Sequence, residues 1–394
     1  MFEGMMLQRV CAACLLLTGT VAMAGGRPRY GGQLDIAAIT KSNELDPLFA
    51  DSPVEAALSS LSSTPICRLT EFSRPSPLTL RLTTVHAALI NTALTRAKTE
   101  ATPYRAFLTS IKAISVTSTG LDLALDAPAP WLEEALCHPS LSVPLAPYVK
   151  GAANSRHPAG RPYPDTLVIQ RTDSRTAERL LTGQKTQVVV GSAAASDAPQ
   201  LFATYAVVAP GKDMLALRDA IDATTERADL ARFFVRPPAS PLFSILPPAL
   251  GGSTAAPPRL PKPSPQKVAR EVMISFDGAN DDHRAIAEKL QVKLQPLGFR
   301  LSLKPLTKNE LWASLPPGNA AALSLRTVLL PASVPAAMTV LSSLGYTTEA
   351  NAAVTLVIPL CVQGVGVSTA NDVQNFHRDS LGLPRLDDVF LSSE

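Results

Sequence analysis

The chain has few cysteines, and this scarcity excludes a disulfide scaffold. Of its five cysteines, two lie within the first 14 residues and three follow, at Cys67, Cys137 and Cys361. Three thiols can close at most one disulfide within a chain, so parity predicts that at least one of them stays reduced. No C-x-x-C motif occurs among these three cysteines, which argues against a structural zinc site.

Motifs for catalysis and for nucleotide binding are also missing. The glycine-containing runs match neither the P-loop nor the dinucleotide fingerprint, and no G-x-S-x-G elbow is present. The histidines are widely spaced, which favours surface or structural roles: His86, His138, His157, His283 and His377. With 36 basic and 33 acidic residues and no basic block interleaved with aromatics, nucleic acid is not an expected partner. We therefore expect no enzyme, no metal and no cofactor.

The one long apolar run lies at the N-terminus. It extends from Val10 to Ala24 behind Arg9 and ends in a small-x-small triplet. The run is too short to span a bilayer and has no polar face, so a secretory signal peptide cleaved after Ala24 is favoured over a membrane span or a buried helix. Cys14 lies inside the run and not after it, which argues against a lipid anchor.

The rest of the chain is long enough for about two domains and alternates strand and helix patterns. Strands are expected at 32–39, 114–117, 121–125, 165–170, 188–190, 201–208, 272–276, 299–303 and 354–360. Helices are expected at 53–61, 102–111, 174–181 and 281–294. The segment 114–125 predicts a β-hairpin around a Ser-Thr-Gly turn.

The clearest unit lies between residues 272 and 303. Two apolar strands flank a helix on which Ile286, Leu290 and Leu294 recur at helical spacing. Such a strand–helix–strand pattern predicts two parallel strands joined by a crossover. We expect the three apolar side chains to face the sheet and Glu288 to face solvent.

Three features allow both a functional and a structural interpretation. The proline-dense segment 237–265 is interpreted as an extended stretch packed over the protein, in preference to a polyproline ligand for a partner. Trp131 and Trp312 are expected to pack in or beside a core, the alternative being the wall of a ligand site. Asp281–His283 is interpreted as a solvated helix start, the alternative being a metal site.

Five segments, taken in order, carry a resemblance to a known family. They are Arg29–Leu34 with Leu45–Pro47, Tyr104–Leu108, Gly160–Asp165, Leu217–Asp222 and Ala285–Phe299. Each is similar to a packing signature of the family 5 extracellular solute-binding proteins, the peptide, opine and nickel binders of ABC importers. The collinear order covers nearly the whole chain after residue 24.

The resemblance implies an α/β fold of the periplasmic binding protein kind, type II-like, with two lobes and a small N-terminal subdomain. The implied domains are the signal peptide at 1–24, lobe one with the subdomain at 25–200, lobe two at 201–350, and a return to lobe one at 351–394. It further implies a periplasmic monomer that captures a small-molecule or peptide ligand by lobe closure and passes it to an ABC permease. Ser42 and Asn43 would face the cleft from lobe one, and Thr204 and Tyr205 from a crossing strand.

The sequence also departs from the family pattern. Residues 139–158 replace two longer family segments, and residues 324–345 contain no aspartate where peptide binders place one to meet the peptide amino terminus. The lobes can therefore be intact while the usual peptide site is absent. The alternative function is that of a binding-protein fold retained as an interaction or sensor protein without transport.

Overall fold

The fold was analysed in a computed structural model of the chain. It describes residues 28–29, 31–42, 45–145, 148–149, 152–153, 163–194, 197–209, 214–258, 261, 270–314, 323–346, 357–385 and 389–392. The expected signal peptide, at 1–24, lies outside these residues. No helix among the described residues has both the length and the hydropathy to cross a bilayer.

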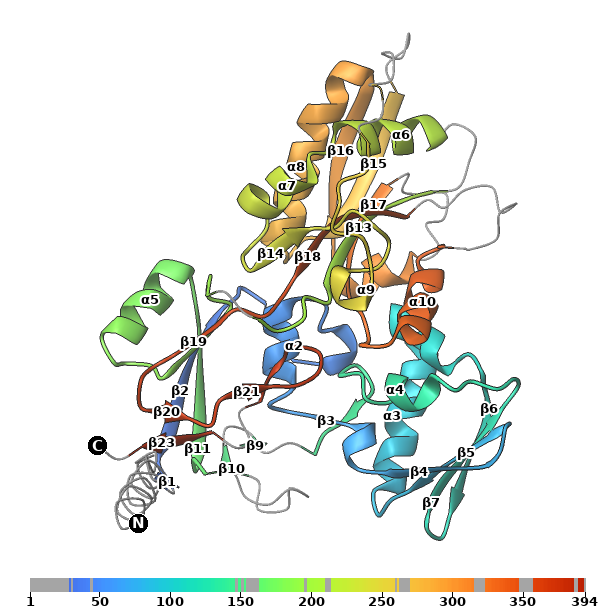
Figure 1. Cartoon of the computed structure of the whole chain (residues 1–394), viewed down its shortest axis with the longest axis vertical. Coiled ribbons are helices and arrows are strands. Elements are labelled where there is room, and N and C mark those ends of the chain that lie inside the picture. The colour runs from blue at the N-terminus through green and yellow to red at the C-terminus, as the bar shows by residue number, and fades with distance from the viewer. Residues whose placement is uncertain are drawn as a thin grey trace, which may run out of the picture.

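Lobe one is the part of the molecule built around a mixed six-stranded sheet (Figure 1). Its strand order is β19 (Val367–Thr369), β12 (Val188–Val190), β2 (Gln33–Ile39), β11 (Thr166–Thr172), β10 (Ala152–Ala153) and β9 (Tyr148–Val149). Strand β2 pairs in parallel with both β11 and β12, and α5 (Ser174–Thr182), which connects those two strands, packs against β2 and β12. The N-cap of α5 is Asp173, whose carboxylate accepts a hydrogen bond from the Thr176 amide.

A smaller antiparallel sheet forms a subdomain of lobe one. Its order is β4 (Glu71–Ser76), β5 (Thr79–Thr83), β7 (Gly120–Leu125) and β6 (Ile111–Thr117). Helix α3 (Ala87–Thr99) contacts strands β6 and β7 and the 3-10 helix η3 (Pro103–Leu108), and its Ile90 and Leu94 are fully buried. The expected hairpin is confirmed: Gly120 opens β7 at φ +154°, where a Cβ would lie 1.9 Å from the Leu82 carbonyl oxygen.

Lobe two is built around a second six-stranded sheet. Its order is β14 (Ala239–Pro241), β18 (Val357–Gln363), β13 (Phe202–Val208), β17 (Leu323–Leu329), β15 (Arg270–Asp277) and β16 (Phe299–Leu306). The helices of this lobe include α6 (Met214–Thr224), α7 (Arg227–Asp229), the π-helical η4 (Leu230–Phe234), α8 (Asp281–Leu294) and α9 (Lys308–Ala313). The two-lobed α/β fold class expected from the sequence is thereby confirmed.

The predicted strand–helix–strand unit is present as β15–α8–β16, with β15 and β16 paired in parallel. The side chains of Ile286, Leu290 and Leu294 are buried in the core of lobe two, whereas Glu288 is exposed. The helix N-cap is Asn280, whose side chain accepts from the amides of Asp282 and His283. The helical spacing therefore identified the buried face correctly.

Along the described elements, the chain changes lobe at four points. It does so between β12 and β13, between β17 and α10 (Val334–Ser343), and between β18 and β19, and α10 and β18 also belong to different lobes. Strand β18 belongs to the sheet of lobe two because it pairs with β13, so the return expected from residue 351 occurs only after Gln363. Helix α10 lies within the span expected for lobe two, but it packs on η3 and on α4 (Leu132–Ala135) of lobe one.

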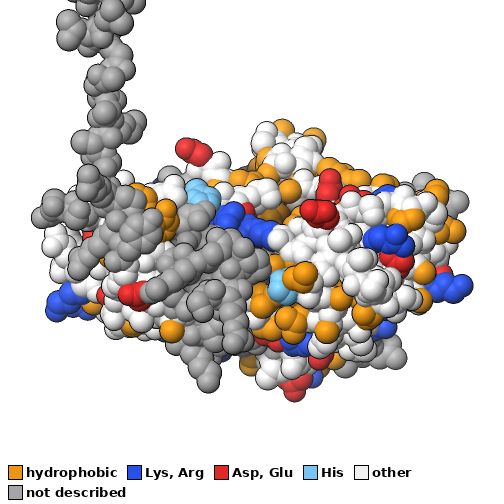
Figure 2. All heavy atoms as spheres, turned by 90° about the horizontal axis from the view of Figure 1, so that it is seen from below, with side chains coloured by type: hydrophobic (Ala, Val, Ile, Leu, Met, Phe, Trp, Pro, Cys, Tyr) orange, Lys and Arg blue, Asp and Glu red, His pale blue; other side chains and the backbone are white. Residues whose placement is uncertain are grey.

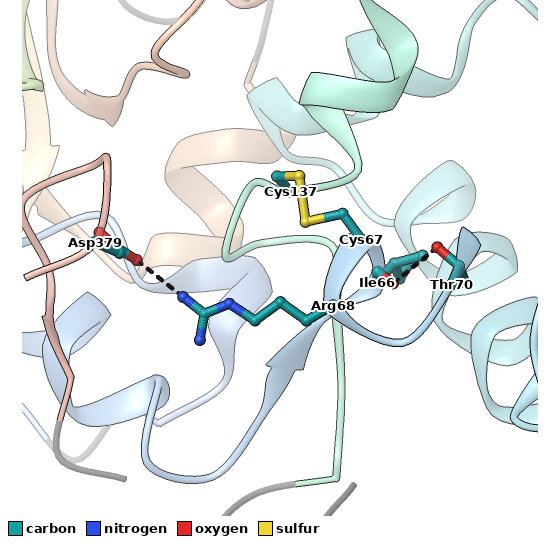
Figure 3. Close-up of a disulfide and its surroundings, with 6 residues drawn as sticks. All are labelled: Ile66, Cys67, Arg68, Thr70, Cys137 and Asp379. Carbon is teal, nitrogen blue, oxygen red and sulfur yellow. Dashed lines mark hydrogen bonds and ion pairs between the residues drawn. A yellow bond between two sulfur atoms is a disulfide. The ribbon is translucent and has the colours of Figure 1, made fainter. Parts of the chain in front are cut away.

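A disulfide joins Cys67 to Cys137 across 70 residues of lobe one (Figure 3). It links η2 (Ile66–Arg68) to the end of α4, and Cys361 of lobe two is a buried free thiol. This arrangement agrees with the parity argument.

The remaining elements are β1 (Pro28–Arg29), η1 (Pro47–Phe49), α2 (Pro53–Ser59), β3 (Thr64–Pro65), β8 (Ser142–Val143), η5 (Pro248–Leu250), η6 (Gln295–Leu297), β20 (Val373–Gln374), β21 (His377–Arg378), β22 (Pro384–Arg385) and β23 (Phe390–Ser392).

The described part of the proline-dense segment lies against the protein, as expected. Leu242 is fully buried and Leu250 is 7% exposed, so the segment contributes apolar side chains to a cluster of buried residues that extends over both lobes. Viewed from below, the surface mixes apolar, polar and charged side chains of both signs (Figure 2).

Candidate ligand-binding cleft

A polar cleft lies where the two lobes meet. Its inner pocket has a volume of about 50 Å³ and opens beside a wider recess of about 630 Å³. The two share lining residues from both lobes: Thr40, Lys41, Gly191, Arg236, Pro237 and Asp281. No aromatic side chain of the described residues lines either space, so the cleft suits a small hydrophilic solute better than an aromatic one.

The cleft follows from the direction of the parallel strands. In lobe one the loops after β2, β11 and β12 line it, and in lobe two the loop after β15 does so. Parallel strands present their carboxyl ends at one edge of a sheet, where ligands of open α/β folds bind. Because this edge of each sheet faces the other, both lobes supply backbone and side-chain polar groups to one space.

The wall from lobe one consists of the loop after β2 and the start of α2. The Ser42 amide donates to Thr40 Oγ1 at 3.0 Å, which folds this loop back at the end of the strand. Ser52 and Glu55 form a capping box that begins α2. Glu55 thereby reaches the inner pocket with a carboxylate already oriented by the Ser52 amide.

The wall from lobe two consists of the loop between β15 and α8 together with the end of β18. Asp282 Oδ2 accepts hydrogen bonds from Gln363 Nε2 at 2.9 Å and from the Arg236 amide at 3.2 Å. Asp277 accepts from the Ala279 amide at 2.9 Å, which fixes the turn after β15. These contacts connect the helix start to the crossing segments, so the wall is preorganised.

Arg236 connects the two walls. Its Nη1 donates to the Ile39 carbonyl oxygen of lobe one at 2.6 Å, while its backbone amide donates to Asp282 of lobe two. The side chain lines both the inner pocket and the wider recess. A guanidinium in this place can present further N–H donors to an anionic or carbonyl group of a solute.

Carboxylates outnumber cations around the inner pocket. Its lining contains Glu55, Asp277, Asp281 and Asp282 against Lys41 and Arg236. Burial raises the pKa of Asp277, of Asp282 and of Glu55 above their ordinary values, although nearby cations and hydrogen bonds oppose this. The excess of acceptors favours a solute that brings N–H or ammonium donors.

The four residues expected at the ligand site have different positions. Ser42 lines the inner pocket, and Asn43 lies outside the described residues. Thr204 is 2% exposed with its Oγ1 2.8 Å from Thr327 Oγ1, and Tyr205 is fully buried with its hydroxyl donating to the Ile245 carbonyl. Thr204 and Tyr205 therefore offer almost no surface to a ligand in this conformation.

Trp312, Trp131 and His283, the other residues considered from the sequence, pack against the protein interior. Trp312 is 3% exposed beneath the Arg326 guanidinium, and Trp131 packs partly buried against the core of lobe one. His283 is 1% exposed and turned inward, with Nε2 2.8 Å from Thr327 Oγ1, so only the Asp281 end of Asp281–His283 is solvated. Within the described part of the chain, no group of three or more potential metal ligands is assembled.

Several lining residues were not anticipated. Arg236, Asp277 and Gln363 lie at the ends of elements that are distant in sequence, and only the sheet topology brings them together. The position of Asp277 could have been predicted from the sequence. Asp277 follows the first strand of the predicted strand–helix–strand unit, and ligands bind at the carboxyl ends of such parallel strands. Nothing local in the sequence distinguishes Arg236 or Gln363 from ordinary surface residues.

Comparison with known proteins establishes the fold. No family model matches the sequence, and no curated protein matches it. Among solved structures, the periplasmic binding protein DppA from Helicobacter pylori in complex with the peptide STSA is similar with a TM-score of 0.69, 12% identity and coverage of 93% of this chain and 99% of that one. The oligopeptide-binding protein AppA from Bacillus subtilis, in complex with a nonapeptide, has a TM-score of 0.66 at 10% identity, with 93% and 100% covered.

A third similar structure is NikA from Staphylococcus aureus in complex with Ni(L-His)2. Its TM-score is 0.63 at 12% identity, and the match covers 92% of this chain and all of that one. The fold expected from the sequence resemblance is thus confirmed over nearly the whole chain.

Proposed function

We propose that this protein captures a small hydrophilic solute between its two lobes and delivers it to an ABC importer. The observation that carries the proposal is a polar cleft at the carboxyl ends of parallel strands from both lobes, within a fold shared with binding proteins. Two lobes that meet around such a cleft can enclose a solute by hinge closure. The structural neighbours described with bound peptides or a nickel complex support this reading.

The solute class follows from the lining. The excess of carboxylates favours an amino or ammonium group, and Arg236 supplies donors for a carboxylate or carbonyl. A short peptide or a solute resembling an amino acid carries both kinds of group. The inner pocket of about 50 Å³ accommodates only a small part of such a molecule, with the rest in the wider recess.

We further propose that the protein acts outside the cytoplasm, in the periplasm, as a monomer that meets an ABC permease. The disulfide between Cys67 and Cys137 supports export, because disulfides persist mainly in oxidising compartments. The apolar run at 10–24 has the layout of a signal peptide.

A second candidate is a binding-protein fold that serves as an interaction or sensor protein. The observation favouring it is the narrowness of the inner pocket, together with the absence of aspartate from residues 324–345 of the sequence. Under this function the lobes would bind no small solute with useful affinity.

Calorimetry against amino acids and di- and tripeptides tests the proposal. Ala279 is exposed in the lining of the inner pocket, so Ala279→Trp should obstruct it without removing a side-chain contact and weaken binding by about tenfold or more. The matched control is Val292→Trp, on an exposed site of α8 away from the cleft, which should leave affinity unchanged. Absence of binding to every solute, or equal affinity for the Ala279→Trp variant, would favour the interaction protein.

A further inference from the structure

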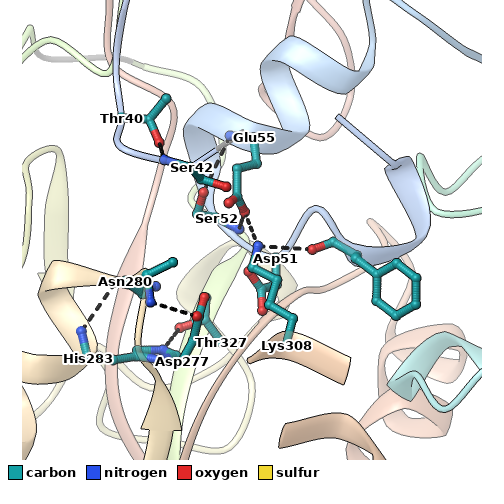
Figure 4. A network of polar contacts seen from close by, with 12 residues as sticks. Thr40, Ser42, Asp51, Ser52, Glu55, Asp277, Asn280, His283, Lys308 and Thr327 are labelled. Carbon is teal, nitrogen blue, oxygen red and sulfur yellow. Dashed lines mark hydrogen bonds and ion pairs between the residues drawn. The ribbon is translucent and has the colours of Figure 1, made fainter. Parts of the chain in front are cut away.

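Lys308, at the start of α9, reaches from lobe two into lobe one (Figure 4). Its ammonium lies 2.8 Å from Asp51 Oδ1, donates to the Phe49 carbonyl oxygen at 3.1 Å, and forms an ion pair with Glu55 Oε2. Three acceptors from one short segment of lobe one thus surround one cation. Lys308 comes two residues after the end of β16, the edge strand of the lobe two sheet.

This ionic contact is largely buried, and only Glu55 of the three residues also lines the inner pocket. The side chains of Lys308, Asp51 and Glu55 are 10%, 3% and 4% exposed. Among the described residues, Lys308 is the one cation within ion-pairing distance of either carboxylate. Burial raises the pKa of both Asp51 and Glu55, which reflects how poorly this site tolerates negative charge.

A second ionic contact between the lobes provides a contrast. Lys41 of lobe one lies 2.9 Å from Asp281 of lobe two, but their side chains are 78% and 48% exposed. Water already solvates both groups there, so such a pair contributes little. At Lys308 the situation differs, because a buried carboxylate that loses its partner keeps the full desolvation penalty.

Opening the lobes would expose Asp51 and Glu55 to water and separate them from Lys308, since the two sides belong to different lobes. Closing them without the ammonium would bury two carboxylates uncompensated. We propose that Lys308 is an interlobe clasp: the closed conformation depends on its neutralising Asp51 and Glu55, and it forms without any solute. This inference concerns the ligand-free protein and does not depend on the identity of a ligand.

The test measures interlobe distance in the ligand-free protein by pulsed electron spin resonance. Spin labels are placed at Arg175→Cys on α5 and Val292→Cys on α8, both exposed helical sites on opposite lobes. The native free thiol, Cys361, is buried and stays unlabelled in the folded chain. The protein with Lys308 intact should give one short distance.

Removing the positive charge of Lys308, while keeping the length of its side chain, should shift the two lobes toward the open conformation. Lys308→Met keeps the length and apolar stem of the side chain but removes the ammonium, and the open-to-closed ratio should rise by about tenfold or more. Lys41→Met is the matched control on the exposed interlobe pair and should leave the distance unchanged. The triple variant Lys308→Met, Asp51→Asn, Glu55→Gln removes the three charges of the clasp together and should close again.

Two results would overturn the clasp. One is a Lys308→Met protein that stays as closed as the parent. The other is a triple variant that is folded, by circular dichroism, and remains open, since this would mean that Lys308 acts by packing and not by charge. If Lys308→Met fails to fold, the triple variant decides the question by the same distances: closed supports the clasp and open refutes it.

Discussion

The two lobes are organised differently. Lobe two has a single six-stranded sheet whose strand–helix–strand unit is formed by one continuous stretch, residues 270–306. Lobe one is divided between a mixed sheet, an antiparallel subdomain and several two-residue strand pairs, and it carries the disulfide. Local apolar periodicity is enough to predict the strand–helix–strand unit of lobe two, although β13 and β18 join its sheet from distant parts of the chain. Lobe one depends on contacts between distant segments throughout and on a covalent link.

The first prediction concerns the link in lobe one and has the largest expected effect. Replacing Cys67 and Cys137 by serine removes a constraint across 70 residues, which should lower the free energy of unfolding by about 4 kcal/mol because the unfolded chain gains entropy. Urea unfolding with and without reductant measures it. If the parent protein is equally stable in reductant and in oxidant, lobe one does not depend on the disulfide.

The second prediction concerns the locally encoded unit of lobe two. Leu290 is 1% exposed in the core of that lobe, so Leu290→Ala should destabilise the protein by about 3 kcal/mol through lost burial and the cavity left behind. Glu288→Ala, on the exposed face of the same helix, should cost under about 0.5 kcal/mol. Equal shifts of the urea midpoint for the two variants would contradict the helix orientation.

How far the sequence predicted the fold follows from this contrast. The strand expected at 272–276 extends over Arg270–Asp277, and the helix face was identified from Leu290 and its neighbours, because both signals are local. The strand expected at 354–360 is present as β18, but its place in the sheet of lobe two was not predicted, since sheet membership depends on which distant strand offers the matching edge.

The candidate site was harder to predict. Ser42 lines the cleft because it follows a strand at the correct edge of its sheet. Thr204 was expected in the cleft because it lies on a strand that follows a crossing between the lobes. The sequence of a strand does not show whether the rest of the protein buries its side chains, and Thr204 is buried. Arg236 could not be predicted as a cleft residue, because its position there depends on contacts with Ile39 and Asp282, which are distant in sequence.

The third prediction uses the buried histidine of lobe one to compare stability at two pH values. His138 is 2% exposed, with its ring nitrogens 2.7 Å from Ser140 Oγ and 3.0 Å from the Leu329 carbonyl oxygen. Burial lowers the pKa of His138 to about 3, below its ordinary value in the unfolded chain. The unfolded state therefore binds more protons between pH 6.5 and 3, so this contribution to stability is complete above pH 6.5 and is lost as the pH falls.

The measurement compares the parent with His138→Gln, which does not titrate in this range. Its destabilisation relative to the parent should shrink by about 2 kcal/mol between pH 7 and pH 5, at 1.36 kcal/mol for each pH unit below 6.5. His283 of lobe two, whose pKa burial also lowers to about 3, should behave in the same way. A difference between parent and variant that is independent of pH would show that His138 titrates normally in the folded protein.

The last prediction concerns the free thiol of lobe two, in contrast to the disulfide of lobe one, and its measure is chemical reactivity and not stability. Cys361 lies fully buried on β18 of lobe two, and burial raises the pKa of its thiol to about 12. Since the thiolate is the reactive form, its fraction at pH 8 falls to about one in ten thousand, against about a quarter for an ordinary thiol of pKa 8.5. Native protein should thus react with a thiol reagent more than about a thousandfold more slowly than denatured protein.

Thiol counting in denaturant without reductant completes this test. An exported chain that lacks residues 1–24 should yield one thiol per molecule, because Cys67 and Cys137 are joined and Cys361 is free. A count of three would mean that lobe one folds without its covalent link. Rapid modification of the native protein would instead mean that β18 separates readily from β13, in which case lobe two, the part whose core is encoded locally, would be the less rigid of the two.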